Sequence, residues 1–156
     1  STLAERIASW PRGFVHRDYQ SRNLMVQEHA DADPSLVWID FQDALLGPRV
    51  YDLVALLNDS YQSFDRSFVE ARLDEYSEHH GLDAVGREAV GREFDTVTVQ
   101  RKLKDAGRFV FIDRVRGNPA FLGFVEPTIE KVFGALERLD GDPTLDRLHA
   151  LLRRLL

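Results

Sequence analysis

The most constraining feature of the sequence is a polar loop set among short apolar segments near its beginning. The stretch FVHRDYQSRNLMV places His16, Arg17, Asp18 and Asn23 between two apolar segments. The turn-forming letters DADPS follow, and then LVWID, an apolar run that is typical of a compact buried strand. These segments predict a small hairpin-like sheet that carries the polar loop at one end, with Asp40 closing the last strand.

Apolar residues on both sides of this loop are expected to pack beneath it and hold it rigid. They are Phe14, Val15, Leu24, Val26, Val37 and Ile39.

The rest of the sequence has helical spacing of its apolar residues. A short helix is expected before Pro11, and further helices are expected over about 49–61, 66–81, 83–115, 126–139 and 143–156. Gly81 is a candidate C-cap for the helix expected over 66–81. Since no linker separates the segments, we predict that residues 1–156 form one domain of the α+β class, mainly α.

Composition excludes several classes of protein. Apolar residues make up 44% of the chain, and the absence of cysteine rules out disulfides and thiolate metal sites. A formal net charge of −6 argues against nucleic acid as a partner, because a surface that follows phosphates needs clustered Lys and Arg. No apolar run approaches the ~18 residues of a membrane span. We expect a cytoplasmic protein with no membrane partner.

Asp18, Asn23 and Asp40 suit phosphoryl transfer if the predicted hairpin brings them together. Such a reaction needs a group that orients an acceptor hydroxyl and takes its proton, and Mg²⁺ that neutralises the phosphates. Mg²⁺ prefers oxygen ligands and often takes only one or two from protein. The alternative is that these three residues only form turns, which Asp and Asn favour.

The motifs also resemble a known family. HRDYQSRN is similar to the catalytic loop of the protein-kinase-like fold, and IDFQD sits where those enzymes carry a second, metal-binding Asp. The short passage DALLGPRVYDL into a helix resembles the aminoglycoside/choline phosphotransferase family. Together with QRKLKDAGRFVFIDRVRGNPAFL, these motifs look most like bacterial N-acetylmuramate/N-acetylglucosamine kinases, which phosphorylate the anomeric hydroxyl of an amino sugar in cell-wall recycling.

This resemblance implies a role for each residue that matches the family pattern. Asp18 would be the catalytic base that faces the sugar hydroxyl. Asn23 and Asp40 would bind Mg²⁺ and, through it, ATP. Met25 would form a floor for the adenine ring.

Other matching residues would support the site rather than react. His16 and Arg17 would brace the loop, and Asp52 in YDL would accept hydrogen bonds from backbone amides of the loop. His16 is expected to be a packed structural histidine and not a proton shuttle. Gln42 departs from the pattern, because protein kinases carry Gly there, and this argues against a mobile switch.

Kinases of this fold hold ATP between two lobes, and the smaller lobe supplies a strand lysine ahead of the catalytic loop. Residues 1–15 contain no Lys; the lysines are Lys102, Lys104 and Lys131. The sequence therefore predicts the C-terminal lobe alone, with a missing N-terminal lobe as its partner. Losing contacts worth roughly 5 kcal/mol would weaken nucleotide binding or turnover about 10⁴-fold, so we expect the chain by itself to be nearly inactive.

Two other functions stay open at this point. The acceptor could be another small alcohol, such as an aminoglycoside or a choline-like molecule. The chain could also be a non-catalytic interaction module that keeps the fold of a kinase lobe.

Three helical segments admit more than one interpretation. The pair His79–His80 is expected to be a solvated helix end and not a metal site, because adjacent helical side chains point about 100° apart. RKLKDAGR could border the acceptor site or form an ordinary exposed face. LDRLHALLRRLL could lie on a membrane by composition, but we expect a terminal helix that docks on the core of the domain.

Overall fold

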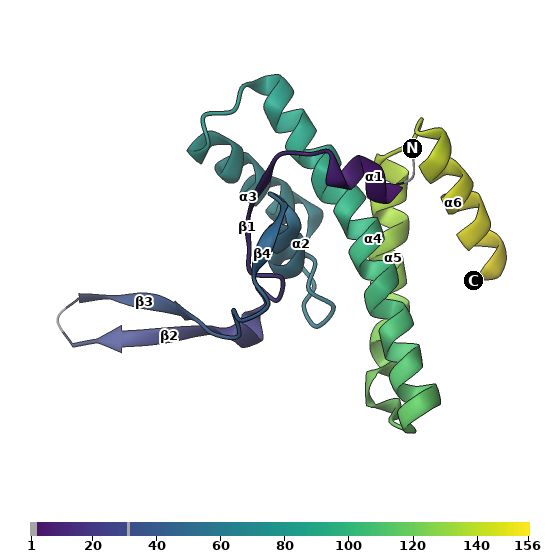
Figure 1. The fold of residues 1–156 in the computed structure, drawn as a ribbon, viewed down its shortest axis with the longest axis horizontal. Coiled ribbons are helices and arrows are strands. Elements are labelled where there is room, and N and C mark those ends of the chain that lie inside the picture. Colours follow the sequence, from purple (N-terminus) through teal and green to yellow (C-terminus); the bar gives the residue numbers. More distant parts are fainter. Residues whose placement is uncertain (1–2, 31) are drawn as a thin grey trace. The chain divides into compact units, whose positions relative to one another are not determined.

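The structure is a computed structural model that describes residues 3–30 and 32–156 (Figure 1). Its contacts divide the chain into two compact units, Ser1–Asp59 and Ser60–Leu156. Helices dominate and the strands are few, so the expected class, α+β and mainly helical, is confirmed. That residues 1–156 form one domain stays a prediction.

The first unit holds the strands. Its elements are α1 (Leu3–Ala8), β1 (Arg12–Val15), the 3₁₀ turn η1 (Ser21–Asn23), β2 (Leu24–His29), β3 (Ala32–Trp38), β4 (Leu45–Pro48) and α2 (Tyr51–Leu57). Strands β2 and β3 form an antiparallel hairpin in which Leu24 pairs with Trp38 and Met25 with Val37. The predicted hairpin is therefore present, and it begins directly after the polar loop.

A second antiparallel pair, β1 with β4, was not expected from the sequence. Gly13 pairs with Gly47 and Val15 with Leu45, so the described residues of this unit form two separate two-stranded sheets. Strand β4 contains Gly and Pro, which are depleted in strands, and this explains why its sequence gives little signal. A Cβ at Gly47 would lie 3.1 Å from Cγ2 of Val15, so the strands approach closely at this glycine.

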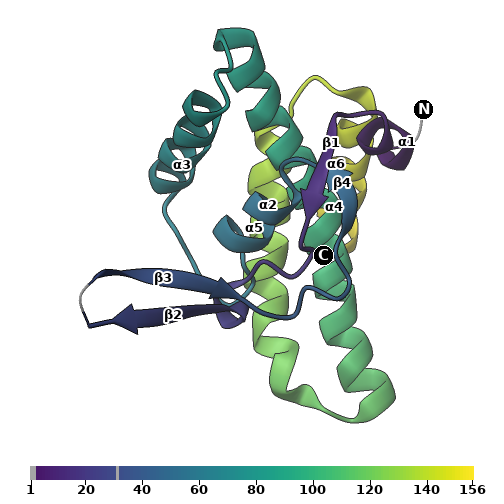
Figure 2. The ribbon, with the colours of Figure 1, turned by 60° about the vertical axis from the view of Figure 1, so that its left-hand side comes forward.

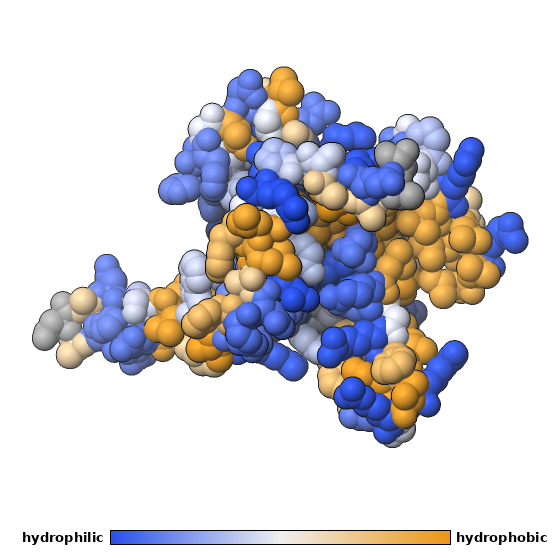
Figure 3. Space-filling model, in the orientation of Figure 1, coloured by the Kyte–Doolittle hydropathy of each residue, from blue (hydrophilic) through white to orange (hydrophobic). Residues whose placement is uncertain are grey.

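The prediction that apolar residues pack beneath the loop is largely wrong. Val15 is buried at 2% exposure, but Phe14 and Val26 are 63% and 66% exposed, and Val37 and Ile39 are also exposed. The physical reason is that the expected residues are split between two ribbons of two strands. Apolar side chains consequently reach the surface along the hairpin (Figure 3).

The second unit is helical. Its elements are α3 (Arg66–His79), α4 (Ala84–Arg116), the 3₁₀ segment η2 (Pro119–Phe124), α5 (Val125–Arg138) and α6 (Pro143–Leu155). All four predicted helices are confirmed, with bounds close to those expected.

The ends of these helices follow from local sequence. The side chain of Asp83 accepts a hydrogen bond from the backbone N–H of Gly86 and caps the start of α4. Gly81 after α3 and Gly117 after α4 have φ of 63° and 65°, a region that glycine enters without a Cβ penalty. The predicted role of Gly81 as a C-cap is thus confirmed.

Helices α4 and α5 lie side by side in both views (Figures 1 and 2). Val90, Phe94 and Val97 of α4 are buried, as are Val132 and Leu136 of α5. This apolar contact is the core of the second unit.

An ion cluster lies in the same unit. The carboxylate of Asp95 on α4 accepts hydrogen bonds from Nε and Nη2 of Arg138 on α5 at 3.0 and 2.8 Å. It also accepts one from Nη1 of Arg66 on α3 at 3.2 Å. Because the Asp95 side chain is only 5% exposed, these bonds neutralise a buried charge and join three helices.

The segment RKLKDAGR is not an ordinary exposed face. Arg101 and Lys102 are each 1% exposed. Nζ of Lys102 donates to Oγ of Ser60 and to Oδ2 of Asp105, each at 3.1 Å. The interpretation as a solvated helix face is therefore wrong for these two residues.

The last helix docks through its first turn. Leu145 is 1% exposed and α6 contacts α5, whereas Leu151, Leu155 and Leu156 are exposed. The expected docking is confirmed for that turn alone. Among the described residues, no helix combines the length and apolar character that a membrane crossing requires.

Candidate functional site

The candidate site lies in the first unit, where the polar loop and the end of β3 meet. The loop runs from His16, just after β1, to Asn23 in η1, and Asp40 follows β3. The backbone N–H of Ile39 donates to the carbonyl oxygen of Asn23 at 3.1 Å. This bond continues the hairpin pairing by one residue and brings the loop beside Asp40.

Asn23 connects the two other candidate residues. Its Nδ2 donates to the backbone carbonyl of Asp18 at 2.8 Å and lies 3.5 Å from Oδ2 of Asp40. Oδ1 of Asp40 accepts a shorter bond, 2.7 Å, from Nε2 of Gln42. The amide of Asn23 therefore lies between the backbone of Asp18 and the carboxylate of Asp40.

Asp52 on α2 accepts two backbone hydrogen bonds from the start of the loop. The N–H of His16 donates to Oδ2 at 2.7 Å, and the N–H of Arg17 donates to Oδ1 at 3.0 Å. Both carboxylate oxygens are thus used on consecutive amides. Hydrogen bonds to an ionised acceptor are stronger than neutral ones, so this contact fixes where the loop begins.

Two residues of the site have backbone conformations that are costly for a side chain. Arg17 has φ of 75° and Asp40 has φ of 67°. The left-handed region costs roughly 1–2 kcal/mol for an L-residue. Neighbouring contacts must compensate, and they do so through Asp52 at Arg17 and through Gln42 at Asp40.

Arg17 also has an exposed interaction at the loop. Its Nη1 donates to the backbone carbonyl of Asp43 at 3.4 Å and lies 4.0 Å from the carboxylate of the same residue. Both side chains are solvent-exposed, so this ion pair stabilises the loop only slightly.

An aromatic row lies along the loop. The ring of Tyr19 packs edge-on against His16 at a centroid distance of 5.9 Å and against Trp38 at 5.5 Å. Burial, and to a lesser degree the negative charge of Asp52, raises the pKa of the Tyr19 hydroxyl above its ordinary value of 10.0. Tyr19 therefore stays neutral at physiological pH.

His16 is 1% exposed. Within the described part of the chain, neither of its ring nitrogens has a hydrogen-bond partner. Its ring instead packs against Tyr19.

The potential metal ligands of this site suit Mg²⁺. Asp40 has a carboxylate, and Asn23 has an amide oxygen besides the Nδ2 that lies 3.5 Å from Asp40. Both are hard oxygen ligands, and Mg²⁺ often takes only one or two carboxylates, with waters and phosphates completing its shell. Residues 3–30 and 32–156 contain no cluster of three or more His, Cys, Asp or Glu that could hold a metal.

The remaining predicted residues are placed as follows. Met25 lies on β2 and is 46% exposed. The rings of His79 and His80 lie 5.4 Å apart, and Nδ1 of His80 is 2.8 Å from the carbonyl oxygen of Tyr76. That contact occupies one ring nitrogen at the end of α3.

Sequence reasoning missed three side chains of the site: Gln42 contacts Asp40, Tyr19 contacts His16, and Trp38 contacts Tyr19. Gln42 was judged only as a departure from a family pattern, although its amide holds Asp40. Tyr19 and Trp38 were not singled out. The available signal was their spacing, since each is within two residues of Asp18 or Asp40.

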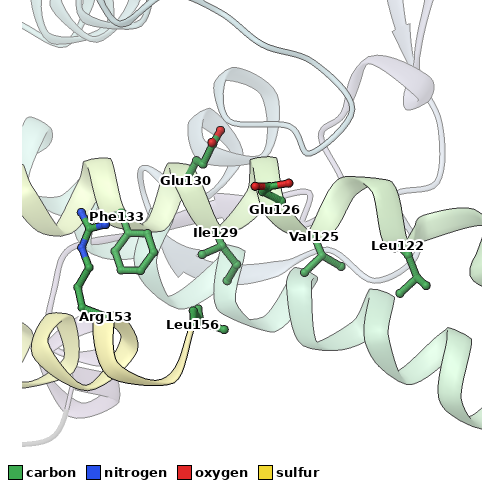
Figure 4. A pocket seen from close by; sticks show the side chains of 8 residues that line it. All are labelled: Leu122, Val125, Glu126, Ile129, Glu130, Phe133, Arg153 and Leu156. Carbon is green, nitrogen blue, oxygen red and sulfur yellow. The ribbon is translucent and has the colours of Figure 1, made fainter.

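A separate hollow of about 530 Å³ lies in the second unit between α5 and α6 (Figure 4). Its apolar lining is Leu122, Val125, Ile129, Phe133 and Leu156. The guanidinium group of Arg153 lies 4.0 Å from the centroid of the Phe133 ring and covers it. None of the candidate residues of the polar loop lies in this hollow.

Comparisons with known proteins identify the family of the chain. A family model described as the phosphotransferase enzyme family matches residues 2–89, which include the polar loop, Asp40 and Asp52. The chain is 36% identical over 127 residues to an N-acetylmuramate/N-acetylglucosamine kinase of Pseudomonas putida, a match that covers 79% of this chain.

Two other relatives with the same name are similar. One from Pseudomonas aeruginosa is 39% identical over 119 residues, or 74% of this chain, and one from Neisseria meningitidis is 33% identical over 162 aligned positions, or 93% of this chain. The matches cover 36%, 34% and 47% of the three relatives. The chain therefore spans about a third to a half of their length.

Proposed function

Because the chain belongs to the phosphotransferase enzyme family, we propose that it is the acceptor-binding part of an ATP-dependent sugar kinase. The reaction transfers the γ-phosphoryl group of ATP to the anomeric hydroxyl of N-acetylmuramate or N-acetylglucosamine. Support for this acceptor comes from the names of the three relatives described above. A role in cell-wall recycling in the cytoplasm belongs to the same proposal.

Each residue of the site has a proposed task. Asp18 orients the sugar hydroxyl and accepts its proton as the bond to phosphorus forms. Asn23 and Asp40 hold Mg²⁺, which, when bound, neutralises charge on the phosphates. Met25, on β2, contacts the adenine ring. The contribution of a positioned base is typically 10²–10⁴-fold in rate.

The observation that carries the proposal is the position of Asn23 between Asp18 and Asp40. A base and a metal site must be held at a constant separation, because phosphoryl transfer depends mainly on positioning and charge. The amide of Asn23 bonds to the backbone beside the base and lies 3.5 Å from the metal-binding carboxylate, and the 3.1 Å bond from the Ile39 N–H to the Asn23 carbonyl holds the two segments together. Asp52 supports the same loop from α2, through the amides of His16 and Arg17.

The test is a kinase assay on the full-length protein that contains this chain. Consumption of ATP would be measured with N-acetylmuramate, N-acetylglucosamine, an aminoglycoside and choline, each with Mg²⁺. The expected result is that the two amino sugars are the best acceptors and that the product no longer reacts as a reducing sugar, because its anomeric hydroxyl is phosphorylated.

Asp18→Asn should lower kcat at least 100-fold with little change in the KM for ATP, since the substitution removes the base and keeps the shape. Asp43→Asn is the matched control, because Asp43 is an exposed carboxylate of the same segment. Full turnover by Asp18→Asn would contradict the catalytic proposal.

We further propose that the 156-residue chain turns over far more slowly by itself than the full-length protein does. The reason is the lack of a phosphate-clamping lysine ahead of the loop. Comparable kcat/KM values for the two proteins would contradict this.

A second candidate is a non-catalytic binding module. The observation in its favour is the apolar surface of the hairpin, where Val26, Leu36 and Trp38 are exposed. If the full-length protein showed no ATP-dependent transfer to any acceptor but lost a binding partner on Leu36→Asp substitution, this candidate would replace the kinase.

A further inference from the structure

Tyr19 has no task in the reaction proposed above, although it contacts both segments that form the site. It follows Asp18 directly, and its ring lies edge-on to Trp38, which is two residues ahead of Asp40. On its other side the ring meets His16, whose backbone N–H is held by Asp52. The row His16–Tyr19–Trp38 thus joins the start of the loop to the end of β3.

This row joins the same two segments as the amide of Asn23, by a different kind of contact. Asn23 connects them through hydrogen bonds, and its contact with Asp40 is long, at 3.5 Å. A hydrogen bond of that length constrains a separation weakly. Edge-to-face ring contacts are directional, so they add a second constraint on the two segments beside the 3.1 Å bond from the Ile39 N–H to the Asn23 carbonyl.

The chemistry of Tyr19 suits a packing role. Its hydroxyl stays neutral across the physiological range, since burial and Asp52 raise its pKa. A neutral ring adds no negative charge beside a site that has to bind both a cation and phosphates.

We infer that Tyr19 is a positioning residue whose ring, held between His16 and Trp38, sets the separation between the Asp18 loop and Asp40 and thereby the affinity for the divalent metal. The inference rests on the proposed function, because it assumes that Asn23 and Asp40 bind that metal. It assigns the effect to the ring and not to the hydroxyl.

The test is the binding of Mn²⁺ alone, used as a probe for Mg²⁺ and measured by electron paramagnetic resonance on the full-length protein. Tyr19→Leu removes the ring contacts with both His16 and Trp38 and should weaken Mn²⁺ binding at least about five-fold, which is the affinity equivalent of one edge-to-face contact. Tyr19→Phe keeps the ring and should restore the affinity. Phe14 is an aromatic residue of β1 that is 63% exposed, so Phe14→Leu is the matched control and should bind Mn²⁺ as the wild type does.

The same contact can be broken from its other side. Trp38→Leu removes the Tyr19–Trp38 contact and should weaken Mn²⁺ binding about five-fold, and the double variant with Tyr19→Leu should lose no more than Tyr19→Leu alone, because that substitution already removes this contact. Trp38 is 50% exposed, so this variant tests the inference even if Tyr19→Leu fails to fold.

The outcomes separate the inference from the proposed function. If the wild-type protein binds no Mn²⁺, or if Asp40→Asn binds Mn²⁺ as tightly as the wild type, the assignment of the metal site to Asn23 and Asp40 is wrong. If Asp40→Asn abolishes binding while Tyr19→Leu and Trp38→Leu bind normally, only the positioning role is overturned. If Tyr19→Phe binds Mn²⁺ as weakly as Tyr19→Leu does, the effect comes from the hydroxyl and the inference that the ring acts is overturned.

Discussion

Removing the carboxylate of Asp52 is expected to loosen the start of the polar loop. In Asp52→Ala, the amides of His16 and Arg17 lose acceptors at 2.7 and 3.0 Å. The amide of His16 is partly buried, so water cannot fully replace the lost hydrogen bond, and its loss should cost about 2 kcal/mol. The amide of Arg17 is exposed, so the loss of its hydrogen bond should cost about 1 kcal/mol. The free energy of unfolding of the first unit should therefore fall by about 3 kcal/mol.

Hydrogen exchange followed by mass spectrometry or NMR measures this effect at the residues concerned. The amides of His16 and Arg17 should lose protection in Asp52→Ala, and urea unfolding should shift to lower concentration. Asp43→Ala is the control, because its ion pair with Arg17 is exposed and should contribute less than about 0.5 kcal/mol. Unchanged exchange at His16, or a loss below about 1 kcal/mol, would refute the assignment of Asp52 as the anchor of the loop.

Three further predictions concern stability. Asp95→Ala should lower the free energy of unfolding in urea by roughly 1.5–3 kcal/mol, because it removes charge-assisted hydrogen bonds to Arg138 and Arg66, whose side chains are 35% and 32% exposed and can regain water; a loss no larger than that of a surface substitution would contradict this. Gly117→Ala should destabilise the protein by about 1 kcal/mol because φ is 65°, whereas Gly107→Ala inside α4 should stabilise it, and equal effects would refute the backbone argument. The raised pKa of Tyr19 means that the folded state keeps this proton above pH 10.0, so stability should fall as pH rises from there, and Tyr19→Phe should remove that part of the slope. An identical pH dependence in the two proteins would contradict the last prediction.

The helices were predictable from the sequence because their apolar residues recur at helical spacing, and some of them also carry start and stop signals. Helix α4 has Asp83 as its cap, apolar residues such as Val90 and Phe94 at helical spacing, and Gly117 just past its end. All of these signals are local, so no knowledge of the tertiary structure was needed.

Burial was harder to predict because it depends on what covers a residue. Val26 and Ile39 have the same apolar character as Val15, yet only Val15 is buried. Arg101 and Lys102 show the reverse, since their charge suggested an exposed face and both are buried. Sequence pattern identifies which residues could be buried, but long-range contacts decide which ones are.

The candidate site was predictable in its residue types and only partly in its geometry. Asp18, Asn23 and Asp40 stand out by spacing between apolar segments, and Asn23 does lie against Asp40. Asp40, which accepts the hydrogen bond from Gln42, has a backbone φ of 67°. The residue type of an aspartate does not reveal that conformation. The tasks assigned to these residues stay predictions until the assays are done.

The continuity of α4 limits how related proteins can differ in length. The helix runs through 33 residues, so one inserted residue would rotate everything beyond it by about 100°. Val90 and Val97 are seven residues apart, so they now face the same side of the helix and both are buried, and an insertion between them would turn one of them away from that side. Insertions and deletions among homologues should therefore avoid α4 and gather in the connections around Leu82, Asn118 and Asp140.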